Sequence, residues 1–156
     1  MKIGIIVHSQ TGNTLSVAEA LKAKLATAGH SVNIERITPE DPKQTVAKKV
    51  KIQKVPDLSA YDALVLAAPV QAFSVSPVMK AYLLQLPALN GEKVALFVTK
   101  GLPFKWTGGN NAISQMKKAV ESKGGTVVGS SIMVWGAAGG RDEKIADLVG
   151  QISKLF

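Results

Sequence analysis

The sequence predicts one α/β domain over residues 1–156, built on a parallel β-sheet with helices on both faces. Short apolar runs alternate with longer segments of helical periodicity from one end of the chain to the other. Several of these runs are apolar at every position, which is typical of strands buried on both faces. Strands that alternate with helices specify parallel pairing through right-handed crossovers. The composition supports one sizeable core, because 46% of the residues are apolar.

The first third of the chain predicts a strand, a helix and a second strand. Residues 3–7 form a continuous apolar run, rich in isoleucine and valine, that suits a buried strand. Residues 13–28 carry apolar side chains at helical spacing, and Gly29 is well placed to end that helix. Residues 31–37 alternate apolar and polar side chains. This alternation predicts a strand with one less buried face.

The remaining elements follow a segment without a clear pattern. Residues 38–60 contain Pro39, Pro42 and Pro56 around a basic stretch that could form one or two helical turns. Three strands and three helices then alternate at residues 63–68, 76–86, 93–99, 110–122, 126–135 and 142–155. In such a sheet a ligand binds outside the carboxyl ends of the strands. The loops after the first, third and fourth strands are therefore the candidate site.

The composition excludes several kinds of site. The chain has no cysteine, which removes disulfides, thiolate nucleophiles, cysteine-ligated zinc and iron–sulfur clusters. Its histidines, His8 and His30, are far apart and have no neighbouring metal-ligand motif, so we expect no metal site. The opening segment lacks the features of a signal peptide, and no apolar run approaches the roughly 20 residues that span a bilayer. We therefore expect a cytoplasmic protein.

The charge balance bears on the partners of the protein. The net charge is +8, from 19 basic and 11 acidic residues. Such an excess is typical of proteins that meet nucleic acid, anionic membranes or acidic proteins. The basic residues are dispersed, and the one short cluster, Lys48, Lys49, Lys51 and Lys54, suits a solvated surface. We expect acidic protein partners, no nucleic acid and no membrane span.

The most informative segment follows the first predicted strand and leads into the first helix. It consists of Ser9, Gln10, Thr11, Gly12, Asn13 and Thr14. A glycine in a tight strand-to-helix turn lets backbone N–H groups converge, and the helix N-terminus adds the positive end of its dipole. Hydroxyl and amide side chains supply further donors, while the loop contains no lysine or arginine. The segment predicts a phosphate site built from uncharged donors.

Other phosphate-binding loops do not match this segment. Walker A requires a lysine after its second glycine, and the dinucleotide fingerprint requires three glycines. The alternative is an ordinary helix start capped by Ser9 or Asn13, without a ligand. The ordered string Ser-Gln-Thr-Gly-Asn-Thr favours the phosphate site. This string resembles the FMN phosphate loop of the flavodoxin family, written Ser/Thr-x-Thr-Gly-Asn-Thr.

The resemblance extends over essentially the whole chain, because the order of elements and two later loops also fit. It implies a flavodoxin-like three-layer α/β sandwich with a five-stranded parallel sheet of order 2-1-3-4-5, of the short-chain type. It also implies FMN as cofactor. The residues that would hold the flavin ring follow the third and fourth strands: Pro69, Val70, Gln71, Ala72, Phe73, Thr99, Lys100, Gly101, Phe104, Trp106 and Gly108.

Three aromatic residues are candidates for the flavin ring site. Phe73 either lines the ring or anchors its loop in the core. Phe104 and Trp106 are both candidates for the ring that stacks on the flavin, and we favour Trp106. The other of these two is then expected in the core.

Three further residues lie near or beyond the expected site. Trp135 ends the fifth strand, and we expect it to serve packing alone. His8 ends the first strand, where it could orient the phosphate loop or, as a sharper hypothesis, act as a general acid. His30 follows Gly29 in a turn and is expected to be exposed to solvent.

Two classes of function fit a bound FMN. An electron carrier passes single electrons between redox partner proteins, whereas a quinone reductase oxidises NAD(P)H at the flavin. The chain has no added substrate-binding insertion, which favours the carrier; a nucleic-acid-binding module is the least favoured interpretation. The positive charge departs from the acidic character of flavodoxins, and Lys100 and Lys105 flank the expected ring.

A charge beside the flavin affects its redox potential. A unit charge about 8 Å away is worth roughly 2 kcal/mol at an effective dielectric near 20, and salt and exposure reduce this to well under about 1 kcal/mol. We expect a less negative midpoint for the fully reduced couple than in acidic flavodoxins.

Overall fold

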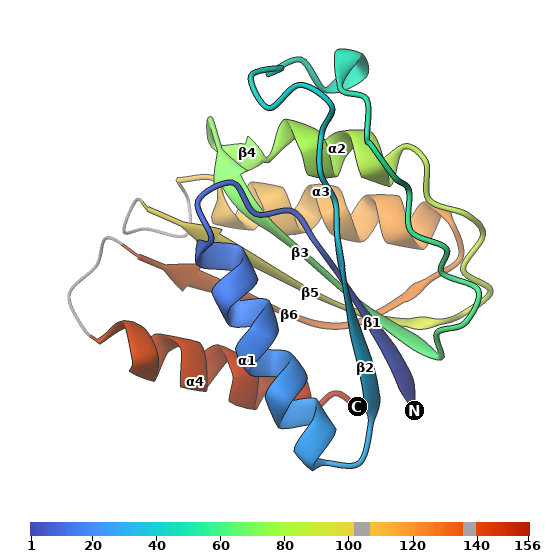
Figure 1. Cartoon of the computed structure of the whole chain (residues 1–156), viewed down its shortest axis with the longest axis vertical. Coiled ribbons are helices and arrows are strands. Elements are labelled where there is room, and N and C mark those ends of the chain that lie inside the picture. Colours follow the sequence, from blue (N-terminus) through green and yellow to red (C-terminus); the bar gives the residue numbers. More distant parts are fainter. Residues whose placement is uncertain (102–106, 136–139) are drawn as a thin grey trace.

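The computed structural model describes residues 1–101, 107–135 and 140–156 of the chain. Strands and helices alternate along it and form three layers, with the sheet in the middle (Figure 1). The elements are β1 (Lys2–Val7), α1 (Asn13–Thr27), β2 (Ser31–Arg36), the 3₁₀ turn η1 (Ala47–Lys49), β3 (Ala63–Gln71), β4 (Ser74–Val75), α2 (Pro77–Leu83), β5 (Lys93–Lys100), α3 (Gly109–Ser122), β6 (Thr126–Val134) and α4 (Arg141–Ser153).

The sheet confirms the predicted topology. Its five parallel strands lie in the order β2-β1-β3-β5-β6, which is 2-1-3-4-5 when only parallel strands are counted. The structure adds β4, which pairs antiparallel with the end of β3 through Val70↔Val75 and Gln71↔Ser74. A two-residue strand is too short to produce an alternating pattern, so the sequence did not indicate it.

The two faces of the sheet are covered by different helices, α1 and α4 on one side and α2 and α3 on the other (Figure 1). Alternate residues of β3 enter opposite cores: Leu64 and Leu66 pack towards α2 and α3, and Val65 packs towards α1. Side chains such as Leu66 and Phe97 are completely buried, and each contributes roughly 1.5–3 kcal/mol by leaving water. The apolar runs of the sequence are therefore the central strands.

The segment between β2 and β3 contains one 3₁₀ turn, η1, in place of a full helix. Pro39 pairs with Ile52 in an isolated antiparallel bridge, so this segment folds back on itself. Proline lacks a backbone donor and its ring blocks a continuing helix, which explains why the segment forms a short turn, within the one or two turns that the sequence predicts. The described residues contain four α-helices.

Helix α2 is shorter than the expected range of 76–86. Its N-cap is Ser76, whose Oγ accepts a hydrogen bond of 3.3 Å from the N–H of Met79. The helix ends at Leu83, four residues before Pro87, which disfavours helical conformation in the residue that precedes it. The other helices lie within a few residues of their predicted bounds.

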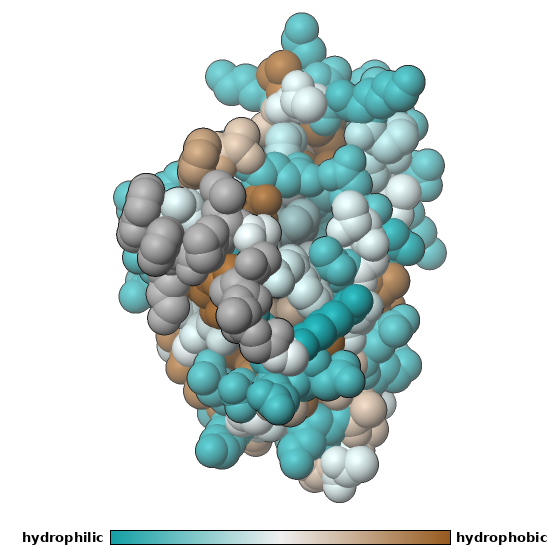
Figure 2. Space-filling model, turned by 90° about the vertical axis from the view of Figure 1, so that its left-hand side faces the viewer, coloured by the Kyte–Doolittle hydropathy of each residue, from teal (hydrophilic) through white to brown (hydrophobic). Residues whose placement is uncertain are grey.

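The carboxyl ends of β1, β3 and β5 meet at one end of the sheet, on the left in Figure 1. Figure 2 views the molecule from that side, with hydrophilic side chains both at the top and over the lower part. No helix in the described parts of the chain is long and apolar enough to cross a membrane.

Candidate functional site

The loop between β1 and α1 folds around the hydroxyl of Ser9. The Ser9 Oγ atom accepts hydrogen bonds from the N–H groups of Gly12, at 3.1 Å, and Leu15, at 3.2 Å. Gly12 has a φ of 90°, in the left-handed region that favours glycine, and open space surrounds its Cα. This turn directs the chain into α1 at Asn13.

The start of α1 presents unpaired backbone donors. The first amides of a helix have no partner within the helix, and the N-cap residue, Gly12, has no side chain to supply one. In the part of the chain that the structure describes, the N–H groups of Thr11, Asn13 and Thr14 have no hydrogen-bond acceptor. Together with the helix dipole, these donors fit a phosphate dianion. The loop can therefore hold the phosphate of FMN.

Side-chain hydrogen bonds join this loop to the two other loops at the same end of the sheet. The hydroxyls of Thr14 and Thr99 lie 2.8 Å apart and are both buried. The Gln71 side-chain N–H donates to the side-chain oxygen of Gln10. The three loops that the sequence selected are thus brought together by direct contacts.

Two neighbouring cavities of about 240 Å³ each lie between these loops. They share Val70, Lys100 and Gly101 as lining residues. The cavity at the phosphate loop is also lined by Gln10, Thr11, Asn13, Thr14, Pro69, Gln71, Thr99 and Trp135, and the other by Ala72, Phe73 and Thr107. Among the residues expected to bind FMN, Ser9 and Gly12 shape the turn without lining these two cavities. Phe104 and Trp106 lie outside the described residues.

The β3–β4 turn has a strained backbone. Its two central residues, Ala72 and Phe73, have φ values of 50° and 61°, which non-glycine residues rarely adopt. Each such residue costs on the order of 1–3 kcal/mol, so neighbouring contacts must hold the turn in place. The Asn111 side-chain N–H donates to the Phe73 carbonyl, and Gln115 Oε1 accepts from the Val75 N–H. Both side chains belong to α3.

Phe73 stands at the tip of this turn and is 60% exposed. The expectation that it could be a core anchor is therefore wrong, because a ring in the core would be almost completely covered. Its side chain lines the cavity beside Lys100 and Gly101 instead. An exposed ring at this position can contact a flavin or a partner.

Gly108 packs closely against the β3–β4 turn. It has a φ of 112°, and a Cβ atom placed on it would lie 2.5 Å from the Phe73 Cα and 2.8 Å from Val70 Cγ1. We expect Gly108→Ala to lower the free energy of unfolding by roughly 2–4 kcal/mol, since it adds both backbone strain and overlap with a backbone atom. Urea denaturation of the FMN-free protein measures this.

The control for that substitution is Gly150→Ala in α4, where an added Cβ meets no atom within 4 Å. In a helix this change should be neutral or stabilising, by up to about 1 kcal/mol. Equal stability of Gly108→Ala and the parent would contradict the close packing of Gly108 against the turn.

Lys100 brings a cation into the site. It is only 3% exposed, and its amine donates a hydrogen bond to the Thr107 hydroxyl. Burial lowers the pKa of this amine from its ordinary value. The sequence predicts lysines whose charge is reduced by salt and exposure, but salt screens a buried charge less. The influence of Lys100 on a flavin would thus depend less on salt than we expected.

Two arginines lie close to the phosphate loop, although none occurs within it. An Arg36 terminal nitrogen donates to the Ser9 carbonyl of the loop at 3.0 Å, and Arg141 donates at 3.1 Å to Ser16 Oγ in the first turn of α1. They come from β2 and from the start of α4, far away in sequence. Neither lines the two cavities, so the expectation that uncharged donors bind the phosphate stays a prediction.

Trp135 has a second role beside the expected packing. It is half-buried against the α1 and α4 core, and the Arg141 guanidinium lies 4.6 Å from the centre of its ring. It also lines the cavity at the phosphate loop. The expectation that Trp135 serves packing alone was therefore wrong. Parallel pairing of β6 with β5 brings the two strand ends together.

His8 is buried behind the phosphate loop. Its Nδ1 lies 2.8 Å from Ser76 Oγ, and its side chain is 5% exposed. Burial, and secondly the positive charge of Arg36, lower the pKa of His8 to about 4. The imidazole is therefore neutral at pH 7, which does not suit a general acid. Because Ser76 caps α2, His8 instead links the phosphate loop to the helix that follows the β3–β4 turn.

His30 differs from its expected exposure. It is half-buried, and its Nδ1 has no hydrogen-bond partner among the described residues.

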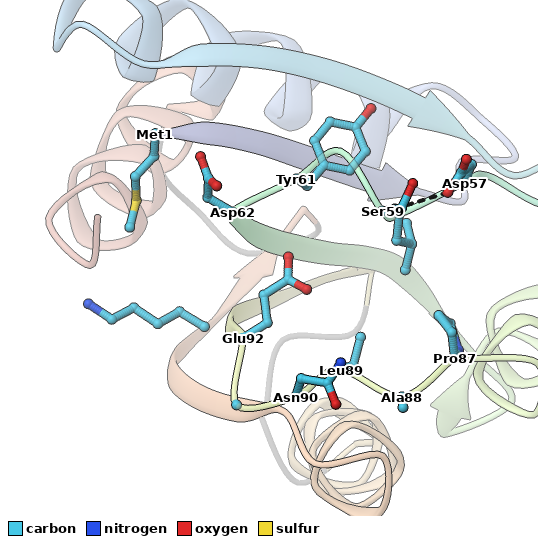
Figure 3. Close-up of a pocket in the computed structure, with 13 residues that line it drawn as sticks. Met1, Asp57, Ser59, Tyr61, Asp62, Pro87, Ala88, Leu89, Asn90 and Glu92 are labelled. Atoms are coloured by element: carbon cyan, nitrogen blue, oxygen red, sulfur yellow. Dashed lines mark hydrogen bonds between the residues drawn. The ribbon is translucent and has the colours of Figure 1, made fainter.

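Another cavity, of about 670 Å³, lies at the other end of the sheet (Figure 3). Asp62 and Glu92 border it, and burial, followed by the charge of Asp62, raises the pKa of Glu92. It lies at the amino ends of β3 and β5, where parallel α/β sheets do not usually bind ligands. We therefore place the functional site at the opposite end.

The fold and the site define a flavodoxin-like FMN-binding protein. Residues 1–139 match the family model described as NADPH-dependent FMN reductase, and the chain belongs to this family. No functionally curated protein matches the sequence significantly.

Known structures with the same fold include flavodoxins from several bacteria. A flavodoxin of Streptococcus pneumoniae TIGR4 is 18% identical, with a TM-score of 0.72, and the match covers 99% of this chain and 96% of that one. The two-electron reduced flavodoxin of Megasphaera elsdenii is 22% identical, with a TM-score of 0.64 over 97% and 98% of the two chains. A flavodoxin, WrbA-like protein from Agrobacterium tumefaciens is 13% identical, with a TM-score of 0.69 over 99% and 96%.

Proposed function

We propose that this protein is an oxidoreductase that holds FMN between the loops after β1, β3 and β5 and receives electrons from NADPH. One observation carries the proposal: the residues with unpaired backbone amides at the start of α1 line the same cavity as Lys100. The family match over residues 1–139 supports NADPH as the electron donor. The family match therefore favours a reductase over the electron carrier that the sequence alone favours.

Each part of the site has a distinct task in this proposal. The amides of Thr11, Asn13 and Thr14 bind the phosphate, and the Thr14–Thr99 bond holds the phosphate loop against β5. The β3–β4 turn and residues 99–101 border the ring. Bound FMN supplies the redox chemistry, by accepting a hydride from a nicotinamide and passing two electrons to an acceptor. Lys100 favours negative charge on the reduced ring, because its cation lies in the same cavity.

The proposed acceptor or redox partner is acidic. The chain carries a net charge of +8, and Lys48, Lys49, Lys51 and Lys54 are all exposed on the segment between β2 and β3. A surface of this charge attracts acidic molecules and speeds their association at low salt.

In the first step of the experiment, FMN is titrated into the purified protein, and the quenching of flavin fluorescence measures its binding. The loaded protein is then mixed anaerobically with NADPH, and the loss of the visible flavin absorbance is followed with time. We expect NADPH alone to bleach the flavin within seconds, NADH to do so more slowly, and an added quinone to sustain turnover.

An electron carrier is the second candidate, supported by the exposed ring of Phe73 next to the cavity. If FMN binds and NADPH bleaches it only after addition of a separate NADPH-dependent reductase, the protein is a carrier. If FMN does not bind, both functions are excluded.

A further inference from the structure

Another cavity borders the phosphate loop, next to the two cavities lined by Lys100. It has a volume of about 540 Å³, within the range of small-molecule sites. Its walls come from the end of β1, the segment after β2, the β3–β4 turn and the start of α2. We call this cavity the Arg36 pocket, after the residue that sets its charge. The FMN site proposed above does not account for it.

A single cation dominates the electrostatics of the Arg36 pocket. Arg36 is the one charged residue among its described lining residues, and no carboxylate faces it there. The hydrogen bond to the Ser9 carbonyl holds the guanidinium in place and occupies one of its five N–H donors. His8, which also lines the pocket, is neutral at pH 7. The pocket therefore presents one positioned positive charge to an occupant.

The other walls combine apolar surface with side-chain amides. Pro39, Pro42 and Val78 provide rigid apolar faces, and Gln44 and Gln71 provide groups that both donate and accept. A flat apolar body can lie against the prolines while the amides contact its polar edge. One positive charge matches one negative charge on such a body, and a guanidinium pairs best with a planar, bidentate acid.

We propose that the Arg36 pocket binds a planar aromatic molecule that carries a single carboxylate or sulfonate group. Gln10 and Gln71, which are hydrogen-bonded to each other, line both the Arg36 pocket and the cavity at the phosphate loop. Ala72 lines both the Arg36 pocket and the cavity beside Phe73. The occupant therefore lies next to the cofactor, separated from it by these side chains. The site is additional to FMN and does not require that NADPH is the reductant.

The test uses 2-naphthoate as the probe and 2-naphthamide as its uncharged match. Both are titrated by calorimetry into the full-length protein loaded with FMN, in the absence of NADPH. We expect 2-naphthoate to bind at one site and about tenfold or more tightly than 2-naphthamide, because the guanidinium pairs with the carboxylate.

Two substitutions locate the site. Arg36→Gln should weaken 2-naphthoate by about tenfold or more while changing 2-naphthamide by less than about threefold. Thr45 lines the pocket but not the FMN cavities, so Thr45→Trp should fill the pocket and abolish probe binding without loss of FMN. Lys48→Gln removes an exposed charge that does not line the pocket, and should leave the probe affinity within about twofold of the parent.

Three results would overturn the proposal. They are equal affinity for the acid and the amide, full 2-naphthoate binding in Thr45→Trp, and release of the bound FMN by the probe. The last result would place the probe in the flavin cavities. Because binding is read without NADPH, a protein that fails as a reductase still gives a valid result here.

Discussion

Replacing Thr11 by Asp is expected to weaken FMN binding by at least about 100-fold while leaving the FMN-free fold intact. Thr11 is exposed and lines the cavity at the start of α1. A carboxylate there would face the phosphate dianion, and two unit charges about 4 Å apart repel by roughly 4 kcal/mol at an effective dielectric of 20. Solvent screening reduces this value, which still leaves about two orders of magnitude in affinity. Quenching of FMN fluorescence measures the dissociation constant.

The matched control is Thr11→Asn, which is close in size to Asp and uncharged. It should bind FMN within roughly tenfold of the parent, since it retains a side-chain donor and adds no charge. Thermal unfolding of FMN-free Thr11→Asp should match the parent or exceed it slightly, because a negative charge near the start of α1 suits the helix dipole. Parent-like FMN affinity in Thr11→Asp would show that the phosphate binds elsewhere.

The second large effect is a loss of stability at acidic pH that is caused by protonation of His8. Its pKa is held at about 4 in the fold, whereas an unfolded histidine titrates near its ordinary value of 6.5. The unfolded state therefore takes up the proton first as the pH falls, and this favours unfolding. The contribution of His8 to stability is fully present above pH 6.5 and is lost between about pH 6.5 and 4, by up to roughly 3 kcal/mol.

Urea denaturation of the FMN-free protein at pH 7.5 and pH 4.5 tests this expectation. The His8→Asn variant should lose distinctly less stability over that interval than the parent, since it has no proton to bind at this position. Its side-chain amide can still form a hydrogen bond with Ser76 Oγ, whichever of the two groups donates. His30→Asn is the control, because it removes the other histidine and keeps His8. An identical loss in His8→Asn and the parent would contradict the proposed protonation.

The fold could be predicted because each element carries its own local pattern. Residues 3–7 and 63–68 are apolar at every position, and only a strand covered on both faces accommodates such a run. The turn glycine and the hydroxyl residues from Ser9 to Thr14 are contiguous in sequence, so their convergence at the start of α1 needed no knowledge of distant residues. The prolines between β2 and β3 explain why this segment forms no long helix. The pairing of Pro39 with Ile52 could not be predicted from the sequence.

Sequence alone thus determined the order of the strands and helices along the chain and which loops form the candidate site. Both depend on periodicity and on neighbours along the chain. Only the tertiary structure decided which charges lie near the site. Arg36, Lys100 and Arg141 come from three separate elements, and the packing of β2, β5 and α4 brings them to the same end of the sheet. It also decided that Phe73 is exposed and His8 buried, since burial depends on what packs against a residue from elsewhere in the chain.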